Sequence, residues 1–313
     1  MRVHVLNVGQ GSCTVIIGDT GAVTIVDGGD ERAWPGRVDV LTWLQANGIT
    51  RIETLILTHL HRDHAQGLLA IAGSIPIGVA HLPYSRFAAP RPSAAWLDGF
   101  VRNADVDSPH GHLQLVTEYL ALLDELDRSG TPVITADSSC RLPIWRDAGW
   151  TLEQLFPRTG DERGTPALVA ALGDADDASL STLLHDLSEH TNDESAVFIL
   201  SRDDETAPPV VFSGDQCGSE SRWRAIAARA DLTGCIWFLP HHGAPDGPSA
   251  AFVAELAPAM LVASAADRGV AEVSAYWAEL ETETGRPVIT THRFPGAERS
   301  VHEYDGLTVS VGG

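Results

Sequence analysis

The chain has 313 residues, of which 44% are hydrophobic, which suffices for one large domain or two small ones with a sizeable core. Its formal net charge is −21, and no cluster of Lys or Arg is present. We therefore expect a small molecule or a short, locally held nucleotide as the substrate rather than long DNA. No run of about 18 apolar residues indicates a membrane span, and the N-terminus lacks signal-peptide features, so we expect a cytoplasmic protein without membrane contact.

Short β-rich runs separated by Gly-rich turns open the chain, which predicts strands at 3–8, 13–17 and 22–26. Apolar periodicity then predicts helices at 36–47 and 65–72, with strands at 55–57 and 79–82. A Pro- and Ala-rich stretch at about 83–112 predicts a long loop or lid. An amphipathic helix is expected at 113–126, and strands at 132–145 and 150–156 close the first half.

An acidic insertion at about 158–189 has no clear pattern, except that 179–187 could be helical. Strands are expected after it at 196–200, 210–212, 236–239, 260–263, 288–289, 300–304 and 307–311. Helices are expected at 219–230, 249–256 and 270–284. Since strand clusters at both ends enclose the helices, we expect the α/β class: two mixed sheets packed face to face in a four-layer αββα sandwich, as one domain over 1–313.

The four cysteines show neither a zinc-ribbon nor a redox pattern, because they are scattered and form no CxxC pair. They are Cys13, Cys140, Cys217 and Cys235. In a reducing compartment we expect each to be a buried, small apolar side chain.

The densest group of chemically active side chains lies between Thr58 and His64, directly after the apolar run 52–57. A strand ending there would place this group on a loop, where its side chains can converge. Imidazole nitrogen and carboxylate oxygen are ligands that suit zinc, and also manganese or iron. The predicted metal ligands of the segment are His59, His61, Asp63 and His64.

Two further motifs place ligand-type side chains at the ends of apolar strands. Asp215 follows the strand predicted at 210–212, and His241 and His242 follow the strand predicted at 236–239. Two metals about 3.5–4 Å apart need a bridging carboxylate. Asp215 suits that role.

These motifs resemble the metallo-β-lactamase fold superfamily. The resemblance rests on Asp27-Gly28-Gly29, His59-x-His61-x-Asp63-His64, Gly214-Asp215 and His241-His242-Gly243. It implies that His59 and His61 serve one metal, that Asp63 and His64 serve another, that Asp215 bridges, and that His242 completes the second site. Two divalent ions per chain are therefore expected, with Zn²⁺ preferred and Mn²⁺ as the alternative.

Within that superfamily the sequence looks most like the hydrolase domain of ComEC-type DNA-uptake proteins and their soluble relatives. The likeness rests on Leu6-Asn7-Val8-Gly9-Gln10-Gly11, Asn192-Asp193-Glu194-Ser195-Ala196-Val197 and Pro240-His241-His242-Gly243. In that group the asparagine replaces a metal-binding histidine, which implies more open positions on the first metal. The chain departs from the group at 267–273, which lacks a Tyr-Gly-His-Pro segment, and in the extra insertion, which could narrow the site or bind a partner.

Several candidate residues keep alternative roles. His241 is the rival of His242 as a ligand, and it could instead bind substrate phosphate or relay a proton. Asn192 either reaches the metal or forms an Asx turn, and His190 could supply the missing histidine ligand. Asp27 is expected to accept a hydrogen bond from a ligand imidazole, with a simple turn residue as the alternative.

The predicted activity is metal-dependent hydrolysis. Two cations make hydroxide available near neutral pH, Asp63 and Asp215 orient it, and His241 protonates or holds the leaving group if it is not a ligand. The preferred substrate is a nucleotide or another small phosphodiester. The alternatives are a carboxyl derivative (lactone, thioester or lactam) and a non-catalytic, metal-binding regulatory protein, and no protein partner is assigned.

Overall fold

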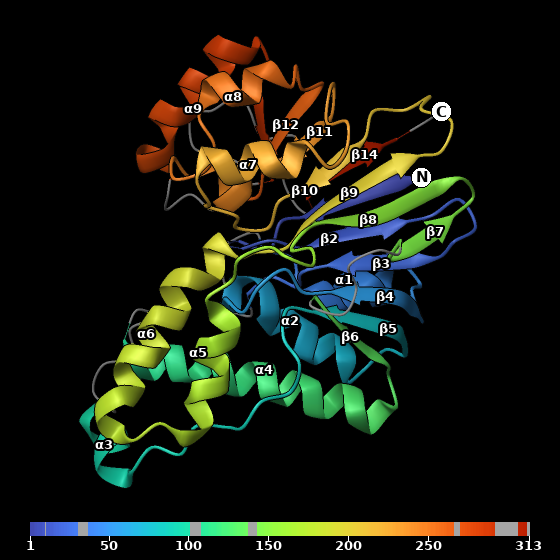
Figure 1. Cartoon of the computed structure of the whole chain (residues 1–313). Helices are drawn as coiled ribbons and strands as arrows, with labels where there is room; N and C mark the ends of the chain where they lie inside the picture. The colour runs from blue at the N-terminus through green and yellow to red at the C-terminus, as the bar shows by residue number, and fades with distance from the viewer. Residues whose placement is uncertain are drawn as a thin grey trace.

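Two seven-stranded sheets form the centre of the molecule, and helices cover their outer faces (Figure 1). The computed structural model describes residues 1–9, 11–30, 37–100, 108–136, 143–265, 270–291 and 306–311. The sheets pack on one another through buried apolar side chains from both, among them Ile16 and Ile56 from one sheet and Phe198 and Phe212 from the other. The predicted αββα sandwich of two mixed sheets is therefore confirmed.

The first sheet has the order β14-β1-β2-β3-β4-β5-β6. Its strands are β1 (Arg2–Leu6), β2 (Thr14–Ile17), β3 (Val23–Val26), β4 (Ile52–Ile56), β5 (Ile77–Leu82), β6 (Val133–Thr135) and β14 (Gly306–Ser310). Pairing is antiparallel from β14 to β3 and parallel from β3 to β6. The helices that follow in this half are α1 (Val40–Ala46), α2 (Arg62–Ala72), α3 (Ala94–Phe100) and α4 (Pro109–Ser129).

The second sheet has the order β13-β12-β11-β10-β9-β8-β7. Its strands are β7 (Trp145–Asp147), β8 (Trp150–Phe156), β9 (Val197–Arg202), β10 (Val210–Phe212), β11 (Ile236–Phe238), β12 (Met260–Ala263) and β13 (Val288–Thr290). Pairing is antiparallel from β7 to β10 and parallel from β10 to β13. Helices α7 (Glu220–Ala227), α8 (Ala250–Glu255) and α9 (Val270–Thr284) cover its outer face (Figure 1).

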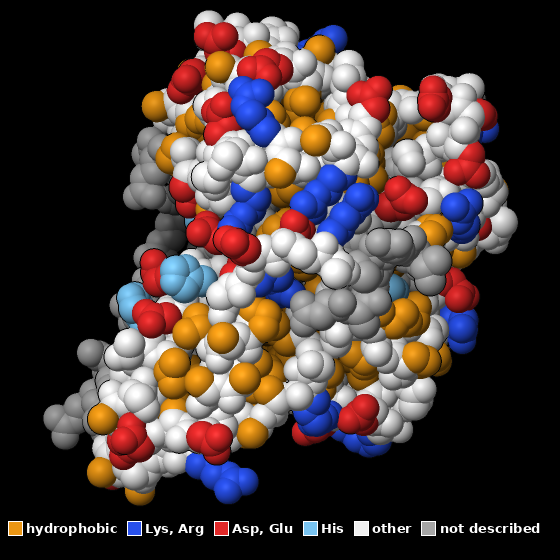
Figure 2. Space-filling view, viewed as in Figure 1, with side chains coloured by type: hydrophobic (Ala, Val, Ile, Leu, Met, Phe, Trp, Pro, Cys, Tyr) orange, Lys and Arg blue, Asp and Glu red, His pale blue; other side chains and the backbone are white. Residues whose placement is uncertain are grey.

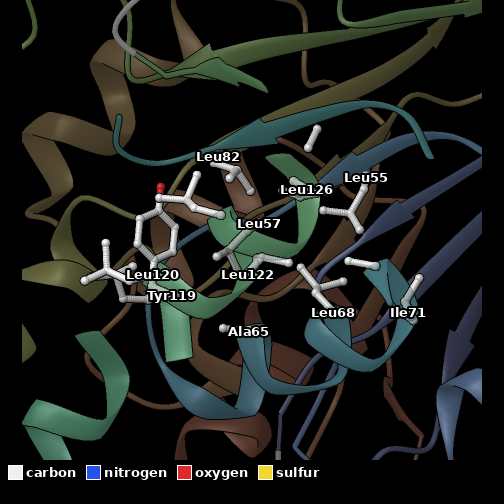
Figure 3. Close-up of a cluster of buried hydrophobic side chains, with 14 of the residues drawn as sticks. Leu55, Leu57, Ala65, Leu68, Ile71, Leu82, Tyr119, Leu120, Leu122 and Leu126 are labelled. Carbon is white, nitrogen blue, oxygen red and sulfur yellow. The ribbon is translucent and has the colours of Figure 1, made fainter. Parts of the chain in front are cut away.

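Helices α2 and α4 form the main core on the outer face of the first sheet (Figure 3). Leu68 and Ile71 of α2 and Leu122 and Leu126 of α4 point toward Leu55 of β4 in this view. These side chains are almost fully buried. The buried face of α2 therefore fixes the helix against the first sheet and α4, which matters because its first turn carries predicted site residues.

The stretch at 83–112 is not the continuous loop that its Pro and Ala content predicts. Helix α3 lies within it, and α4 begins at Pro109, with the Ser108 hydroxyl accepting a hydrogen bond from the Gly111 amide. A proline at the first helical position and a serine cap both favour a helix start, so the local signal for the helix was present.

The insertion at 158–189 is helical over most of its length. It contains α5 (Thr165–Ala171), the short 3₁₀ helix η1 (Leu172–Asp174) and α6 (Asp177–Asp193). Leu180, Leu184 and Leu187 of α6 are buried in the same core as α2 and α4. Their spacing of four and three residues places them on one face of a helix. The helix is stable because this face packs against the core.

Among the described residues, no helix is both long and apolar enough to cross a membrane. The strand predicted at 300–304 lies outside the described residues.

Candidate metal centre

The loops that follow four parallel strands meet at one edge of the sandwich. Asp27 follows β3, the segment 58–64 follows β4, Asp215 follows β10, and the double-histidine turn follows β11. Neighbouring parallel strands end on the same side, so their following loops must lie together. The two sheets thereby contribute side chains to a common site.

The six predicted metal ligands form two adjacent groups. His59, His61 and Asp215 make the first group, and Asp63, His64 and His242 the second; the ligand atoms of each lie within 4.8 Å of one another. Asp215 lies between the groups. Its carboxylate is 3.6 Å from His59 Nε2, 3.1 Å from His64 Nε2 and 3.4 Å from His242 Nε2.

The segment after β4 differs in one respect from the loop that the sequence analysis expects. His61 is the N-cap of α2, and Asp63 and His64 lie in the first turn of that helix. An aspartate is favoured at this place because the helix N-terminus carries partial positive charge. The helix, with its buried face, thus fixes two candidate ligands more rigidly than a loop would.

Asp27 fixes the orientation of the His64 ring. Its buried carboxylate accepts hydrogen bonds from the Thr58 amide at 2.8 Å, the Thr58 hydroxyl at 2.9 Å and His64 Nδ1 at 2.7 Å. Because Nδ1 donates to Asp27, Nε2 of His64 faces Asp215 and is the nitrogen that would bind a metal ion in place of a proton. The expected contact between Asp27 and a candidate ligand imidazole is therefore present.

Replacing Asp27 by Asn is expected to weaken metal binding by about 10–100-fold, as is usual when a residue that orients a ligand histidine is lost. The amide can present its NH₂ group to His64 Nδ1, which would no longer be held as a donor. A metal titration followed by calorimetry measures the effect. Asp186→Asn, on α6 and outside both ligand groups, is the charge-matched control, and an unchanged affinity in Asp27→Asn would contradict the assigned role.

Two hydroxyl groups hold the His59 ring. Its Nδ1 lies 3.0 Å from Thr58 Oγ1 and 3.2 Å from Ser195 Oγ, while Ser195 Oγ also accepts the Asp215 amide at 3.0 Å. His59 Nε2 is buried and has no hydrogen-bond partner among the described residues. Buried polar atoms are rarely left without a partner, so this nitrogen is suited to hold a metal ion.

Gly214 allows these groups to approach one another. Its φ is +50°, and a Cβ built on it would lie 2.2 Å from Ser195 Oγ and 2.9 Å from Thr58 Cβ. The glycine thus lets the β10 loop pack directly on the two hydroxyls that orient His59.

We expect Gly214→Ala to lower the free energy of unfolding by about 1–3 kcal/mol, because the methyl group has no space and the backbone is in the left-handed region. Urea denaturation of the metal-free protein measures this loss. Gly234→Ala is the comparison, since that glycine also has a positive φ but an added Cβ meets nothing within 4 Å. Equal losses in the two variants would show that close packing at Gly214 is unimportant.

The double-histidine turn η2 (Pro240–Gly243) sends its two imidazoles in different directions. His241 and His242 have φ values of 47° and 57°, which are uncommon for residues with a Cβ and often mark functional sites. His242 Nε2 lies 3.3 Å from Asp63 Oδ2 and 3.4 Å from His64 Nε2. His241 Nδ1 instead lies 2.7 Å from Asp246 Oδ2.

The charges of the two groups suit divalent cations. Burial disfavours charge on each group, yet Asp215 and Asp27 raise the pKa of His64 well above its usual value, and Asp215 and Asp63 raise that of His242 to about 10. The pKa values of Asp63 and Asp215 are lowered in return. Burial lowers the pKa of His59 and His61, which keeps their rings neutral and able to coordinate. The carboxylates therefore attract positive charge, and the donor atoms are those that Zn²⁺ and Mn²⁺ accept.

A cavity of about 720 Å³ opens onto both groups. The end of α6 forms one wall, so the insertion contributes to the site, as the sequence analysis allowed. Asn192 lies in this wall with Nδ2 3.5 Å from His241 Nε2, and its Oδ1 has no hydrogen-bond partner among the described residues. His190 lines the same cavity, and Figure 2 shows histidine and acidic side chains side by side near the left edge of that face.

Two residues at the cavity were not recognised from the sequence. Cys217 was expected to be a buried apolar side chain, but it lines the cavity, with Sγ 3.3 Å from His241 Nδ1 and 3.4 Å from Asp246 Oδ2. Asp246 was not singled out. Both could have been suspected from the sequence, because Cys217 closely follows Asp215 and Asp246 closely follows His241. Cys13 and Cys235 are buried as expected, and Cys140 lies outside the described residues.

Comparison with known proteins agrees with the fold. The sequence profile of the metallo-beta-lactamase superfamily matches residues 6–138, which is less than half of the chain. The chain contains a metallo-beta-lactamase superfamily domain. Asp27 and the segment 59–64 lie within the matched range of this domain, whereas Asp215 and His242 lie beyond it. No curated protein sequence matches the chain.

Several solved structures match the chain at low sequence identity. YhfI from Bacillus subtilis, a metallo-beta-lactamase fold protein, is 12% identical, with a TM-score of 0.46 and coverage of 99% of both chains. Zn²⁺-bound PqqB from Methylobacterium extorquens is 12% identical, with a TM-score of 0.45 and coverage of 99% of this chain and 100% of the other. CmlA from Streptomyces venezuelae, a diiron beta-hydroxylase, is 16% identical with a TM-score of 0.41; 92% of this chain matches, and it spans 44% of CmlA.

Proposed function

We propose that this protein is a metal-dependent hydrolase with two divalent ions held side by side. The observation that carries the proposal is the position of Asp215, whose carboxylate lies within 3.6 Å of histidines from both ligand groups. A carboxylate between two sets of histidine and aspartate ligands is the arrangement that a dinuclear site needs. His59, His61 and Asp215 would hold one ion, and Asp63, His64, His242 and Asp215 the other.

Two bound cations would lower the pKa of water enough to supply hydroxide near neutral pH. Asp63 and Asp215 orient that water by accepting its hydrogen bonds, and Asp27 keeps the proton of His64 on Nδ1. His241 is proposed to act on the leaving group. Its Nδ1 donates to Asp246 Oδ2, and Asp246 and Asp215 raise the pKa of His241 despite its burial, which favours the imidazolium form. In that form Nε2 carries a second proton, which it can give to the leaving-group oxygen.

We favour Zn²⁺ as the ion because histidine provides most of the donors. Mn²⁺ is the alternative, since the first group would have open positions if Asn192 does not coordinate. His190 belongs to neither group of ligand atoms among the described residues, and Asn192 lies with Nδ2 3.5 Å from His241 Nε2. We therefore assign both residues to the substrate side of the cavity rather than to the metals.

A small phosphodiester is the proposed substrate. The likeness of the opening motif, the Asn192 segment and the double-histidine turn to ComEC-type hydrolase domains supports this class. The cavity wall favours a small substrate over long DNA. Its described residues include Asp63, Asp215 and Asp246, and its arginine, Arg62, is held by Glu118 at 3.4 Å. Bound metals would be the main positive charge available to a phosphate.

Hydrolysis of a carboxyl derivative is the second candidate. The same acidic wall favours it, because a neutral lactone, thioester or lactam meets no repulsion there. ComEC-type nuclease domains usually carry a Tyr-Gly-His-Pro segment, and this chain lacks its histidine. That difference also favours a carboxyl derivative as the substrate.

The deciding experiment uses metal-free protein resupplied with Zn²⁺ or Mn²⁺ and assayed on bis(p-nitrophenyl) phosphate, a lactone and a thioester. We expect metal-dependent turnover of the phosphodiester, with a higher kcat/KM than for the other two substrates. A preference for the lactone or thioester would overturn the substrate class while keeping the hydrolase. Two bound ions per chain without turnover on any substrate would favour a metal-binding regulatory protein.

A further inference from the structure

A third group of ligand-type side chains lies beside the two already described. Cys217 Sγ, His241 Nδ1 and Asp246 Oδ2 converge at the mouth of the cavity, and their ligand atoms lie within 4.8 Å of one another. The group shares no residue with the other two. Cys217 comes from the loop after β10, and His241 and Asp246 come from the turn and loop after β11.

We propose that Cys217, His241 and Asp246 form a separate binding site for a third divalent cation of the zinc class. One thiol, one imidazole and one carboxylate are all zinc ligands, and a sulfur donor selects against Mg²⁺ and Ca²⁺. Among the described residues, this is the group of ligand atoms that includes a sulfur.

The distances support a tetrahedral site. Metal–ligand bonds of about 2.0–2.3 Å at tetrahedral angles place ligand atoms about 3.3–3.6 Å apart. Sγ of Cys217 is already 3.3 Å from His241 Nδ1 and 3.4 Å from Asp246 Oδ2. Only the hydrogen bond between His241 and Asp246, at 2.7 Å, has to open by about half an ångström.

The site is accessible. The side chains of His241 and Asp246 are 31% and 50% exposed, so a hydrated ion can reach them and keep a water in the fourth position. Coordination would replace the Cys217 S–H contacts to the Asp215 carbonyl and to Asp246, and the thiol proton would pass to the solvent. The competing explanation is a hydrogen-bonded triad that orients His241 without any metal.

Occupancy would also fix the tautomer of His241. A cation on Nδ1 leaves the proton on Nε2, which lies 3.5 Å from the Asn192 amide. Rotation of that amide would bring Oδ1, which lacks a hydrogen-bond partner among the described residues, to accept the Nε2 proton. The third ion would therefore connect the histidine turn to the wall formed by α6.

Titration of the reduced, metal-free protein with Co²⁺ tests the site without an activity assay. Thiolate coordination gives a near-ultraviolet sulfur-to-cobalt charge-transfer band, which the two sulfur-free groups cannot produce. We expect this band to saturate and to disappear in Cys217→Ser, which should bind one Co²⁺ fewer per chain. Asp246→Asn should keep the band but need at least about 10-fold more Co²⁺ to reach it.

Cys13→Ala, Cys140→Ser and Cys235→Ala are the controls for the other three thiols, and all should retain the band. Circular dichroism and the remaining Co²⁺ equivalents show that Cys217→Ser has folded. Absence of the band in the parent protein, or its loss in Cys140→Ser instead of Cys217→Ser, overturns the proposal. Either result leaves the two proposed catalytic ions untouched, because they depend on the other two groups, and His241 Nδ1 would then keep its hydrogen bond to Asp246.

Discussion

Replacing Asp215 by Asn should abolish paired metal binding and lower turnover by more than about 100-fold. Losing a residue that only orients a metal ligand usually lowers metal affinity or activity by about 10–100-fold. Asp215 would contact both proposed ions directly, so its loss should have a larger effect. A neutral amide has one oxygen acceptor instead of a charged carboxylate and cannot balance two cations. Metal analysis of the dialysed variant and its kcat/KM on bis(p-nitrophenyl) phosphate measure the two effects.

The fold should survive this change. Asn has nearly the same shape as Asp, and the backbone amide of residue 215 still donates to Ser195 Oγ. Ligands that bind only the folded protein stabilise it, by about 2.7 kcal/mol at a hundred times their Kd. Zn²⁺ should therefore raise Tm in the parent protein and in the Asp186→Asn control, but much less in Asp215→Asn. If Asp215→Asn still bound two ions and kept full turnover, the proposed role of Asp215 between the two ions would be wrong.

Replacing Glu194 by Ala should cause the largest loss of stability, about 3–5 kcal/mol, which is usual when one partner of a buried ion pair is removed. Glu194 and Arg163 lie 3.2 Å apart, and both side chains are 6% exposed. The carboxylate also accepts hydrogen bonds from the Gly164 amide and the Thr165 hydroxyl. This one side chain thus ties the start of α5 to the segment that enters β9.

Urea denaturation of the metal-free protein measures the effect, and Glu255→Ala is the matched control. Glu255 pairs with Arg224 at 2.8 Å, but both side chains are about half exposed, so its loss should hardly change stability. Replacing both Arg163 and Glu194 by apolar residues should recover part of the loss, because no unpaired charge is then buried. A small effect in Glu194→Ala would mean that the insertion is held by the apolar face of α6 alone.

Local sequence patterns predict most of the strands and helices to within a few residues. Short, uninterrupted apolar runs mark the buried strands β9 and β10, and the helical spacing of apolar residues from Leu113 to Leu126 marks α4. The patterns were weaker at 83–112 and at 158–189. There, composition favoured loops, while packing against the core of the first sheet made the segments helical.

The sequence by itself determined the fold class and the candidate ligands. The cluster from His59 to His64 is dense enough to be recognised without a structure, and Asp215 and His242 each follow an apolar strand. The candidate ligands can be recognised from the sequence because only a few residue types bind metals. Their positions directly after predicted strands also indicate that they lie at one edge of a sheet.

Only the tertiary structure decided how these residues meet. It placed Asp215 between two groups of ligands and directed His242 toward the site, while His241 turned toward Cys217 and Asp246. Two neighbouring histidines look equivalent in the sequence, but left-handed backbone angles separate their side chains. Contacts between loops far apart in the chain depend on how two sheets pack, and no local pattern encodes that packing.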